Sequence, residues 1–186
     1  MTCIVAMGSN LSTQKMVPRE LLEHALELFA DEGLTIRARS SFFANPAFPA
    51  GSGPDFLNGI VIVESELTPE QILEALHRIE AMLGRMRTQR WGPRAIDLDL
   101  IACGNLVLPD VETVTQWMTL RPEEQLQRTP QSLLLPHPRM QDRAFVLVPM
   151  AEIVPEWAHP VTGLTVHEML AALPSEQVSD VLVIGR

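Results

Sequence analysis

The chain has 186 residues, of which 46% are hydrophobic and 20% are charged, and its formal net charge at pH 7 is −9. This length fits one domain with a sizeable core, or one domain with an insertion, and the composition is that of a soluble globular protein. The acidic balance, with Lys15 as the one lysine, argues against broad contact with nucleic acid or an anionic membrane, because both need a basic surface.

Residues 2–108 alternate between strand-like and helix-like patterns. Helical spacing of apolar residues, with a proline near the start, predicts two helices, over residues 18–31 and 68–83. Apolar runs bounded by turn residues predict strands over residues 2–7, 34–43, 56–64, 95–102 and 106–108. The order βαββαβ predicts an α+β fold, a ferredoxin-like αβ sandwich in which an antiparallel sheet carries two helices on one face.

The rest of the chain is less regular and predicts extra C-terminal elements. Residues 109–133 are polar, and we expect a surface insertion that is partly helical around 122–127. A proline-rich approach leads to the apolar run 145–148, and residues 166–173 are expected to form a short terminal helix. We therefore expect residues 1–186 to form a single domain with one insertion.

Two further patterns concern redox state and location. Cys3 and Cys103 lie in apolar strand-like runs without CxxC spacing, so we expect reduced core residues rather than a disulfide or a metal pair. No stretch approaches 18 apolar residues, and the N-terminus lacks a basic region followed by a long apolar run. These features predict a cytoplasmic protein without a membrane span.

Asp97 and Asp99 stand inside an apolar strand-like run. Because side chains alternate along a strand, both carboxylates share one face, with Cα atoms roughly 6.6 Å apart. Two charges on a half-buried strand are costly unless something neutralises them. The pair therefore predicts a site for Mg²⁺ that bridges phosphates, and the alternative is a solvated strand face paired to arginines.

Basic residues precede this strand in an otherwise acidic chain. Arginines suit phosphate oxygens, although such a cluster could also complete the C-terminus of the preceding helix. They are Arg85, Arg87, Arg90 and Arg94. Trp91 between them is either ordinary packing or a lid that orders on ligand binding. Gly8-Ser9-Asn10 after the first strand is either a plain turn or a backbone approach to a phosphate.

Three residues suit a flat heterocycle. Phe56 and Phe145 flank polar motifs and could stack on the two faces of a ring, although each alone could equally be a core residue. Asn58 shares the strand face of Phe56 and could hydrogen-bond such a ring. His137 is held extended between two prolines, as either a ligand-binding residue or a buried structural histidine.

Together these motifs resemble the 6-hydroxymethyl-7,8-dihydropterin pyrophosphokinase family of the folate pathway. The matching segments are Gly-Ser-Asn-Leu at 8–11, Pro-Asp-Phe-Leu-Asn at 54–58, Arg-Ile-Glu at 78–80, the run from Gly84 to Asp99, and Pro-His-Pro-Arg at 136–139 with its continuation to Pro149. The resemblance covers residues 3–160 apart from the insertion. It implies a ferredoxin-like fold and transfer of the pyrophosphoryl group of ATP to the pterin hydroxymethyl oxygen, with release of AMP.

The resemblance also implies roles for individual residues. Asp97 and Asp99 would hold two Mg²⁺ ions, and with Arg85 and Arg94 they would form the catalytic group. ATP would be bound by Arg85, Arg87, Trp91, Arg94, His137 and Arg143. The pterin would be bound by Asn45, Phe48, Phe56, Asn58 and Phe145. The expected partners are these two small molecules, without nucleic acid or membrane, and the expected state is a monomer, with a dimer as the alternative.

Two other classes of protein share some of these features. A nucleotidyltransferase also uses a Gly-Ser loop and an Asp-x-Asp pair, but in that class the two motifs lie close together, whereas Ser9 and Asp97 are far apart in this chain. A ferredoxin-like RNA-binding module would need a basic sheet face and more aromatic residues than the 5% present here.

Overall fold

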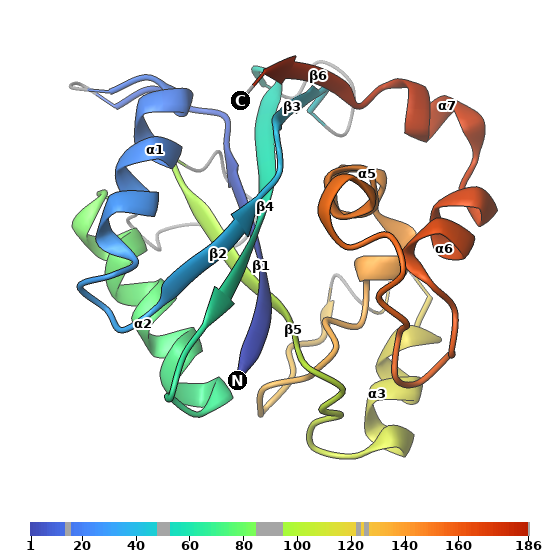
Figure 1. The fold of residues 1–186 in the computed structure, drawn as a ribbon. Helices are drawn as coiled ribbons and strands as arrows, with labels where there is room; N and C mark the ends of the chain where they lie inside the picture. Colours follow the sequence, from blue (N-terminus) through green and yellow to red (C-terminus); the bar gives the residue numbers. More distant parts are fainter. Residues whose placement is uncertain (14–15, 48–52, 85–94, 122–123, 125–126, 186) are drawn as a thin grey trace.

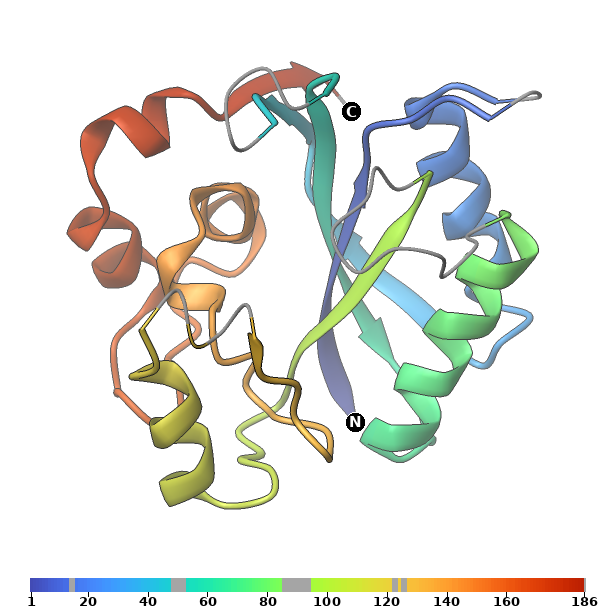
Figure 2. The same ribbon diagram turned by 180° about the vertical axis from the view of Figure 1, so that it is seen from behind.

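The structure is a computed structural model, which describes residues 1–186 apart from 14–15, 48–52, 85–94, 122–123, 125–126 and 186. Its elements in chain order are β1 (Thr2–Ser9), α1 (Pro18–Leu28), β2 (Thr35–Arg39), β3 (Phe42–Asn45), β4 (Phe56–Glu64), α2 (Pro69–Met82), β5 (Asp97–Cys103), α3 (Val111–Met118), a 3₁₀ turn (Met140–Asp142), α5 (Ala144–Ile153), α6 (Val166–Ala172), α7 (Ser175–Ser179) and β6 (Leu182–Gly185). Helices lie on both sides of a central twisted sheet (Figures 1 and 2).

The sheet has the strand order β5-β1-β4-β3-β6, and β2 pairs with β4 beside this path. The pairings between these strands are antiparallel. Strands β1 to β5 with helices α1 and α2 form the βαββαβ unit of a ferredoxin-like fold, which confirms the predicted fold class. The strand expected over 34–43 is divided into β2 and β3.

The division between β2 and β3 occurs at a polar tie to α5. The backbone N–H and the hydroxyl of Ser41 both donate to the Glu152 carboxylate, at 2.9 and 3.0 Å. The Ser40 hydroxyl oxygen accepts the Ile60 N–H of β4 at 2.9 Å. Because the Ser40 hydroxyl takes the place of a backbone acceptor and Ser41 bonds to α5, the strand is interrupted here. The bonds of Ser41 also attach the sheet to α5.

Helices α1 and α2 cover one face of the sheet, as predicted. The sheet residues that point toward them are Cys3, Val5, Met7, Val61, Val63, Leu98 and Leu100. α2 begins with a capping box, in which Thr68 Oγ1 accepts the Gln71 N–H at 3.3 Å and the Gln71 side chain accepts the Thr68 N–H at 3.0 Å. Pro69 at the first helical position completes this start signal.

The opposite face of the sheet is also covered, by C-terminal elements whose placement the sequence did not indicate. Ile4, Ile60, Ile62 and Ile101 pack there against α5 and α6. The reason lies in β4, whose residues 58–63 are all buried, so that both faces of the strand need a covering layer. The sequence shows the apolar strand but not which later segment covers it.

The C-terminal elements differ in part from expectation. The apolar run 145–148 lies inside α5, and the helix expected over 166–173 is confirmed as α6, although it is not terminal, because α7 and β6 follow it. β6 extends the sheet beside β3. The strand expected over 106–108 is reduced to one bridge between Leu108 and Leu135, since Leu106 and its neighbours form no ladder.

Cys3 and Cys103 form a disulfide, so the expectation of two reduced cysteines is wrong. The residues are 100 positions apart in the chain, but the β1–β5 register places them opposite each other with Cα atoms 4.1 Å apart. Spacing along the sequence carries no information about this register, which is why it did not reveal the pair.

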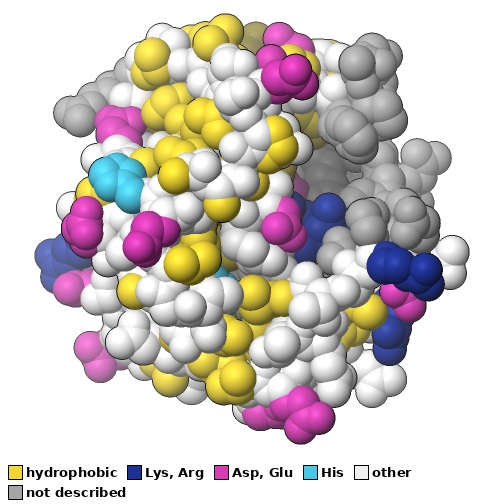
Figure 3. All heavy atoms as spheres, turned by 90° about the vertical axis from the view of Figure 1, so that its right-hand side faces the viewer, with side chains coloured by type: hydrophobic (Ala, Val, Ile, Leu, Met, Phe, Trp, Pro, Cys, Tyr) yellow, Lys and Arg dark blue, Asp and Glu magenta, His cyan; other side chains and the backbone are white. Residues whose placement is uncertain are grey.

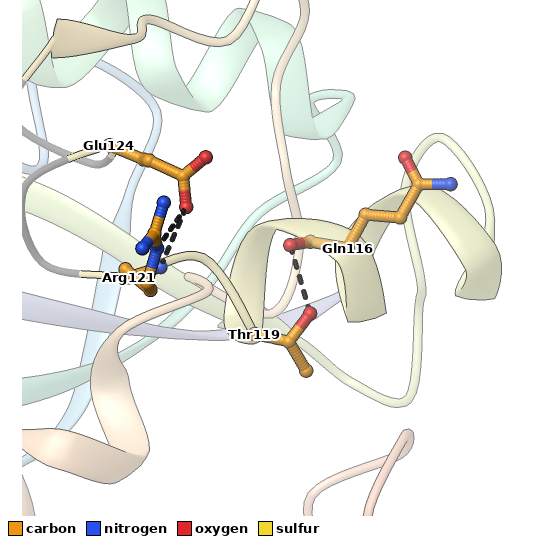
Figure 4. A network of polar contacts seen from close by, with 4 residues as sticks. All are labelled: Gln116, Thr119, Arg121 and Glu124. Atoms are coloured by element: carbon orange, nitrogen blue, oxygen red, sulfur yellow. Dashed lines mark hydrogen bonds and ion pairs between the residues drawn. The ribbon is translucent and has the colours of Figure 1, made fainter.

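α3 opens the segment expected to be an insertion. Figure 4 shows the polar contacts that follow it: the Thr119 hydroxyl donates to the Gln116 carbonyl at 3.2 Å, and Arg121 donates to Glu124 at 3.2 Å. The helix expected around 122–127 falls mostly outside the described residues. Within the parts of the chain that the structure describes, each helix is too short or too polar to cross a bilayer.

The capping box of α2 gives a test of the fold. Replacing Thr68 by alanine removes the acceptor of the Gln71 N–H and should lower the free energy of unfolding by about 1 kcal/mol. Thr68→Ser keeps the hydroxyl and should remain within a few tenths of a kcal/mol of the original protein. Urea denaturation followed by circular dichroism measures both, and equal stability of the two variants would contradict the assigned cap.

Candidate active site

The two aspartates of β5 lie on the face of the sheet that looks toward α5. Leu98, between them, is buried in the core beneath α1 and α2, so Asp97 and Asp99 point the other way. Both are only partly buried. Their register partners on β1 are Gly8 and Ala6. The prediction that the two carboxylates share one face is confirmed.

The outer edge of β5 is held by a buried acid from the Arg-Ile-Glu segment, to which the sequence assigned no role. The Leu98 N–H, between the two aspartates, donates to Glu80 Oε1 of α2 at 2.7 Å. Glu80 is 1% exposed. The signal was present, because Glu80 continues the apolar spacing of Ile72 and Leu76 along α2. An acid at a core position of a helix needs a polar partner, and here that partner is the strand that carries the site.

The last residue of β1 and the residue after it contact the segments that precede β5 and β4. The Ser9 hydroxyl donates to the Ala95 carbonyl, and the Asn10 side-chain amide donates to the Pro54 carbonyl at 3.4 Å. Ser9 and Asp97 are therefore close in space although they are far apart in the chain. This closeness in space leaves unchanged their wide separation along the chain, which counts against a nucleotidyltransferase.

His137 lies against the other end of β5. Its backbone N–H donates to the Ile101 carbonyl at 2.8 Å, and its Nδ1 accepts the Arg139 N–H at 3.1 Å. Burial lowers the pKa of His137 from 6.5 to about 3; the charges of Arg143 and Arg139 add to the lowering, and Asp97 opposes it. The ring is thus neutral at pH 7, and because Nδ1 accepts a hydrogen bond, the ring proton is on Nε2.

The expected pterin-binding residues that the structure describes lie on β3, β4 and α5. Asn58 is 6% exposed, and its side-chain amide donates to the Asn45 side-chain oxygen on the neighbouring strand. Phe56 pairs with Asn45 and, two residues before Asn58, shares its face of the sheet. Phe145 packs at the start of α5, where the Arg143 guanidinium lies 5.5 Å from the centre of its ring. The two aromatic rings therefore belong to the sheet and to the layer that covers it.

β1 joins the two halves of this site. In the strand register Asn58 of β4 lies opposite Gly8, and Gly8 lies opposite Asp97 of β5. Directly paired residues of neighbouring strands point to the same face, so the amide and the acid form one row across three strands. This row places the candidate pterin residue and the candidate metal ligand on either side of a glycine.

Five of the predicted site residues fall outside the described residues: Phe48, Arg85, Arg87, Trp91 and Arg94. A surface hollow of about 460 Å³ lies between α3 and the segment 128–134, and none of the predicted site residues that the structure describes lines it. Figure 3 shows the α6–α7 side, where the described basic side chains form no continuous patch among the acidic and hydrophobic ones.

Comparisons with known proteins agree on one family. Residues 4–155 match the model of the family described as 7,8-dihydro-6-hydroxymethylpterin-pyrophosphokinase. Curated proteins named 2-amino-4-hydroxy-6-hydroxymethyldihydropteridine pyrophosphokinase are similar to this chain. The protein of Methylorubrum extorquens is 36% identical, with 91% of each chain covered. The protein of Pseudomonas aeruginosa is 36% identical, with 94% of this chain and 93% of that protein covered.

The fold is also similar to a solved structure. The wild-type HPPK-DHPS protein of Plasmodium falciparum superposes with a TM-score of 0.64 over 91% of this chain, at 14% sequence identity. This chain spans 44% of that longer protein. At this identity the likeness concerns the fold alone.

The low pKa of His137 predicts how stability depends on pH. Between pH 6.5 and about 3 the unfolded chain binds a proton at this residue that the folded chain does not. The free energy of unfolding should therefore fall as the pH falls through this window, by roughly 1.4 kcal/mol per pH unit for one such group. Denaturant unfolding at a series of pH values measures the slope.

Variants separate the contributions to that slope. Burial also lowers the pKa of His159, whose side chain is fully buried, so it acts in the same direction. His137→Gln and His159→Gln should each reduce the slope of the free energy of unfolding against pH by the contribution of the histidine that is removed. An unchanged slope in His137→Gln would contradict the neutral state assigned to this ring.

Proposed function

Because this chain belongs to the 7,8-dihydro-6-hydroxymethylpterin-pyrophosphokinase family, we propose that it transfers the pyrophosphoryl group of ATP to 6-hydroxymethyl-7,8-dihydropterin in folate biosynthesis. The products are the pterin diphosphate and AMP. The observation that supports this most is the row across β4, β1 and β5, which sets Asn58 and Asp97 on one face with Gly8 between them. Pyrophosphoryl transfer requires the acceptor and the phosphate donor to lie side by side, and this row sets the proposed pterin residue beside the proposed metal ligand.

Asp97 and Asp99 are the proposed ligands of two Mg²⁺ ions. Their donor set fits this cation, because Mg²⁺ is usually held by one or two carboxylates together with water and substrate phosphates. Both side chains lie on the α5 side of the sheet and are partly exposed, although Asp97 Oδ1 itself is buried. When bound, the metal ions supply charge neutralisation of the phosphates and a lower pKa for the acceptor hydroxyl.

His137 and Arg143 are proposed to contact ATP from the side of α5. The Nε2–H of a neutral His137 can donate to a phosphate oxygen without a change of protonation near pH 7, since its pKa is about 3. Arg143 supplies a permanent positive charge. Four further residues, outside the described parts of the chain, are proposed to close on the phosphates: Arg85, Arg87, Trp91 and Arg94.

The pterin is proposed to lie between aromatic rings of the two layers. Phe56 and Phe145 would stack on its faces, and Asn58, held in place by Asn45, would hydrogen-bond its polar edge. Phe48 is proposed to complete the pocket. In this arrangement the protein holds two substrates in a defined orientation, which is the main demand of phosphoryl chemistry.

The reaction needs no nucleophilic side chain. The acceptor hydroxyl oxygen forms a bond to the β-phosphorus of ATP, the bond from that phosphorus to the oxygen it shares with the α-phosphate breaks, and AMP leaves with the bonding electrons. The hydroxyl proton is released to solvent. The chain's contribution is to orient both substrates and to stabilise the charge that develops on the phosphate oxygens.

The proposal also covers the domain organisation, location and oligomeric state of the protein. We propose that residues 1–186 act as a single domain, with 109–133 as a surface insertion, and that the protein works as a cytoplasmic monomer, with a dimer as the alternative. The acidic composition supports small-molecule substrates rather than nucleic acid.

Product analysis tests the proposed reaction. With ATP, Mg²⁺ and hydroxymethyldihydropterin the protein should release AMP in equal amount to the pterin diphosphate. Omission of the pterin, or removal of metal with EDTA, should stop AMP release. Chromatography of the nucleotides decides the outcome, and ADP as the product, or no turnover, would contradict the proposal.

The two aspartates give a second test. Asp97→Asn and Asp99→Asn keep the size of the side chain but remove the charge that attracts Mg²⁺, so AMP release should fall by roughly 100-fold or more in each. Asp31→Asn, at an exposed position after α1, is the matched control and should keep full activity. Thermal unfolding shows whether the variants remain folded, and full activity in either site variant would refute the metal role.

A further inference from the structure

Gly8 occupies the centre of the row that joins the two halves of the site. It pairs with Asn58 on one side and with Asp97 on the other. Its φ angle is not in the left-handed region, where Gly33, Gly84 and a few other glycines of the chain lie. The backbone at residue 8 therefore does not itself require glycine, and another reason must account for the missing side chain.

The reason is the position of the Asn58 side chain. A Cβ atom added to Gly8 would lie 2.8 Å from Asn58 Oδ1 and 3.9 Å from its Cγ, with no closer neighbour. The first distance is shorter than a carbon and an oxygen can approach without a bond or hydrogen bond. The Asn58 amide thus leans over β1 into the space that any other residue at position 8 would fill.

Asn58 cannot move aside without loss. It is 6% exposed, and its amide donates to the Asn45 side-chain oxygen. A methyl group at residue 8 would push on Oδ1 and turn the amide away from this partner. The next β1 residue on the same face is Ala6, opposite Asp99, so β1 places nothing larger than a methyl group beside the two acids.

We propose that Gly8 is a positioning residue for the acceptor substrate. Its missing side chain lets Asn58 lie across β1, and it leaves the space through which the hydroxymethyl group of a pterin held at Asn58 reaches phosphates held at Asp97. This inference rests on the proposed function. The position of the acceptor substrate then depends on Gly8, a residue without a side chain that could contact the substrate.

Gly8→Ala tests the inference by steady-state kinetics of AMP release. The displaced amide loses a hydrogen bond to the acceptor, so the KM for hydroxymethyldihydropterin should rise about tenfold, and kcat should fall as the acceptor is misplaced. The affinity for ATP with Mg²⁺, measured by calorimetry in the absence of pterin, should stay within twofold of the original. An unchanged acceptor KM, or an equal loss of ATP affinity, would overturn the proposal.

Gly59→Ala is the matched control. Gly59 pairs with Met7, one residue from Gly8, and its added Cβ would meet Phe42 at 3.3 Å on the opposite face of the sheet. This variant adds the same methyl group to the same part of the sheet, so it reports the cost of crowding alone. It should lower the thermal midpoint and leave the acceptor KM unchanged, and an acceptor defect equal to that of Gly8→Ala would overturn the proposal.

If Gly8→Ala folds poorly, a double-mutant cycle with Asn58, measured as the free energy of unfolding, still tests the inference. In an Asn58→Ala background the added methyl no longer meets Oδ1, so Gly8→Ala should cost less stability there than in the original chain. Equal costs in both backgrounds would show that Asn58 is not the obstacle. If the original protein itself released no AMP with the pterin, the proposed function would fail, whereas normal turnover with an unaffected Gly8→Ala would fail the inference alone.

Discussion

The register of β1 with its two neighbours is the constraint on which the site depends. Gly8 must stand opposite both Asn58 and Asp97, and a slip of one residue in either pairing would turn the amide or the acid to the other face of the sheet. The apolar layers on the two faces fix this register, because a slip would also expose the buried residues of β1 and β4. The disulfide at the far end of the β1–β5 pair fixes it a second time.

Polar ties act where the strands carry site residues. Glu80 holds the Leu98 N–H between the two aspartates, and the Ser9 hydroxyl holds the chain just before them. On the other side of the sheet, Glu152 fastens Ser41 beside β3. Each tie satisfies polar groups in part-buried or buried surroundings, so its loss would cost both a hydrogen bond and the desolvation of the group left behind. Among the described residues, helices on both faces of the sheet contribute to holding the site through Glu80 of α2 and Glu152 of α5.

The sequence predicts what depends on local spacing. Alternation placed Asp97 and Asp99 on one face, and the proline and capping residues at Thr68 marked the start of α2. Pairing between distant segments leaves no local trace, so the sequence did not show that residues 145–148 would form a helix over the second face, or that Cys3 would meet Cys103. The same limit hid the nearness of Ser9 to β5 and the reason for a glycine at position 8. The residues proposed to act in the site were recognisable by type, whereas the placement of residues from distant segments relative to one another was not.

The two edges of the sheet are unequal in their capacity to accept another strand. Along β5 two outer backbone groups are already used, the Leu98 N–H by Glu80 and the Ile101 carbonyl by the His137 N–H. At the other edge, β6 presents Leu182, Val183 and Ile184 at 60%, 63% and 54% exposure. An extended segment from outside can lengthen the sheet only where hydrogen-bonding positions remain open, and at Leu98 and Ile101 of β5 they are taken. Growth of the sheet, and the aggregation that such growth starts, is thereby directed to the edge far from the two acids.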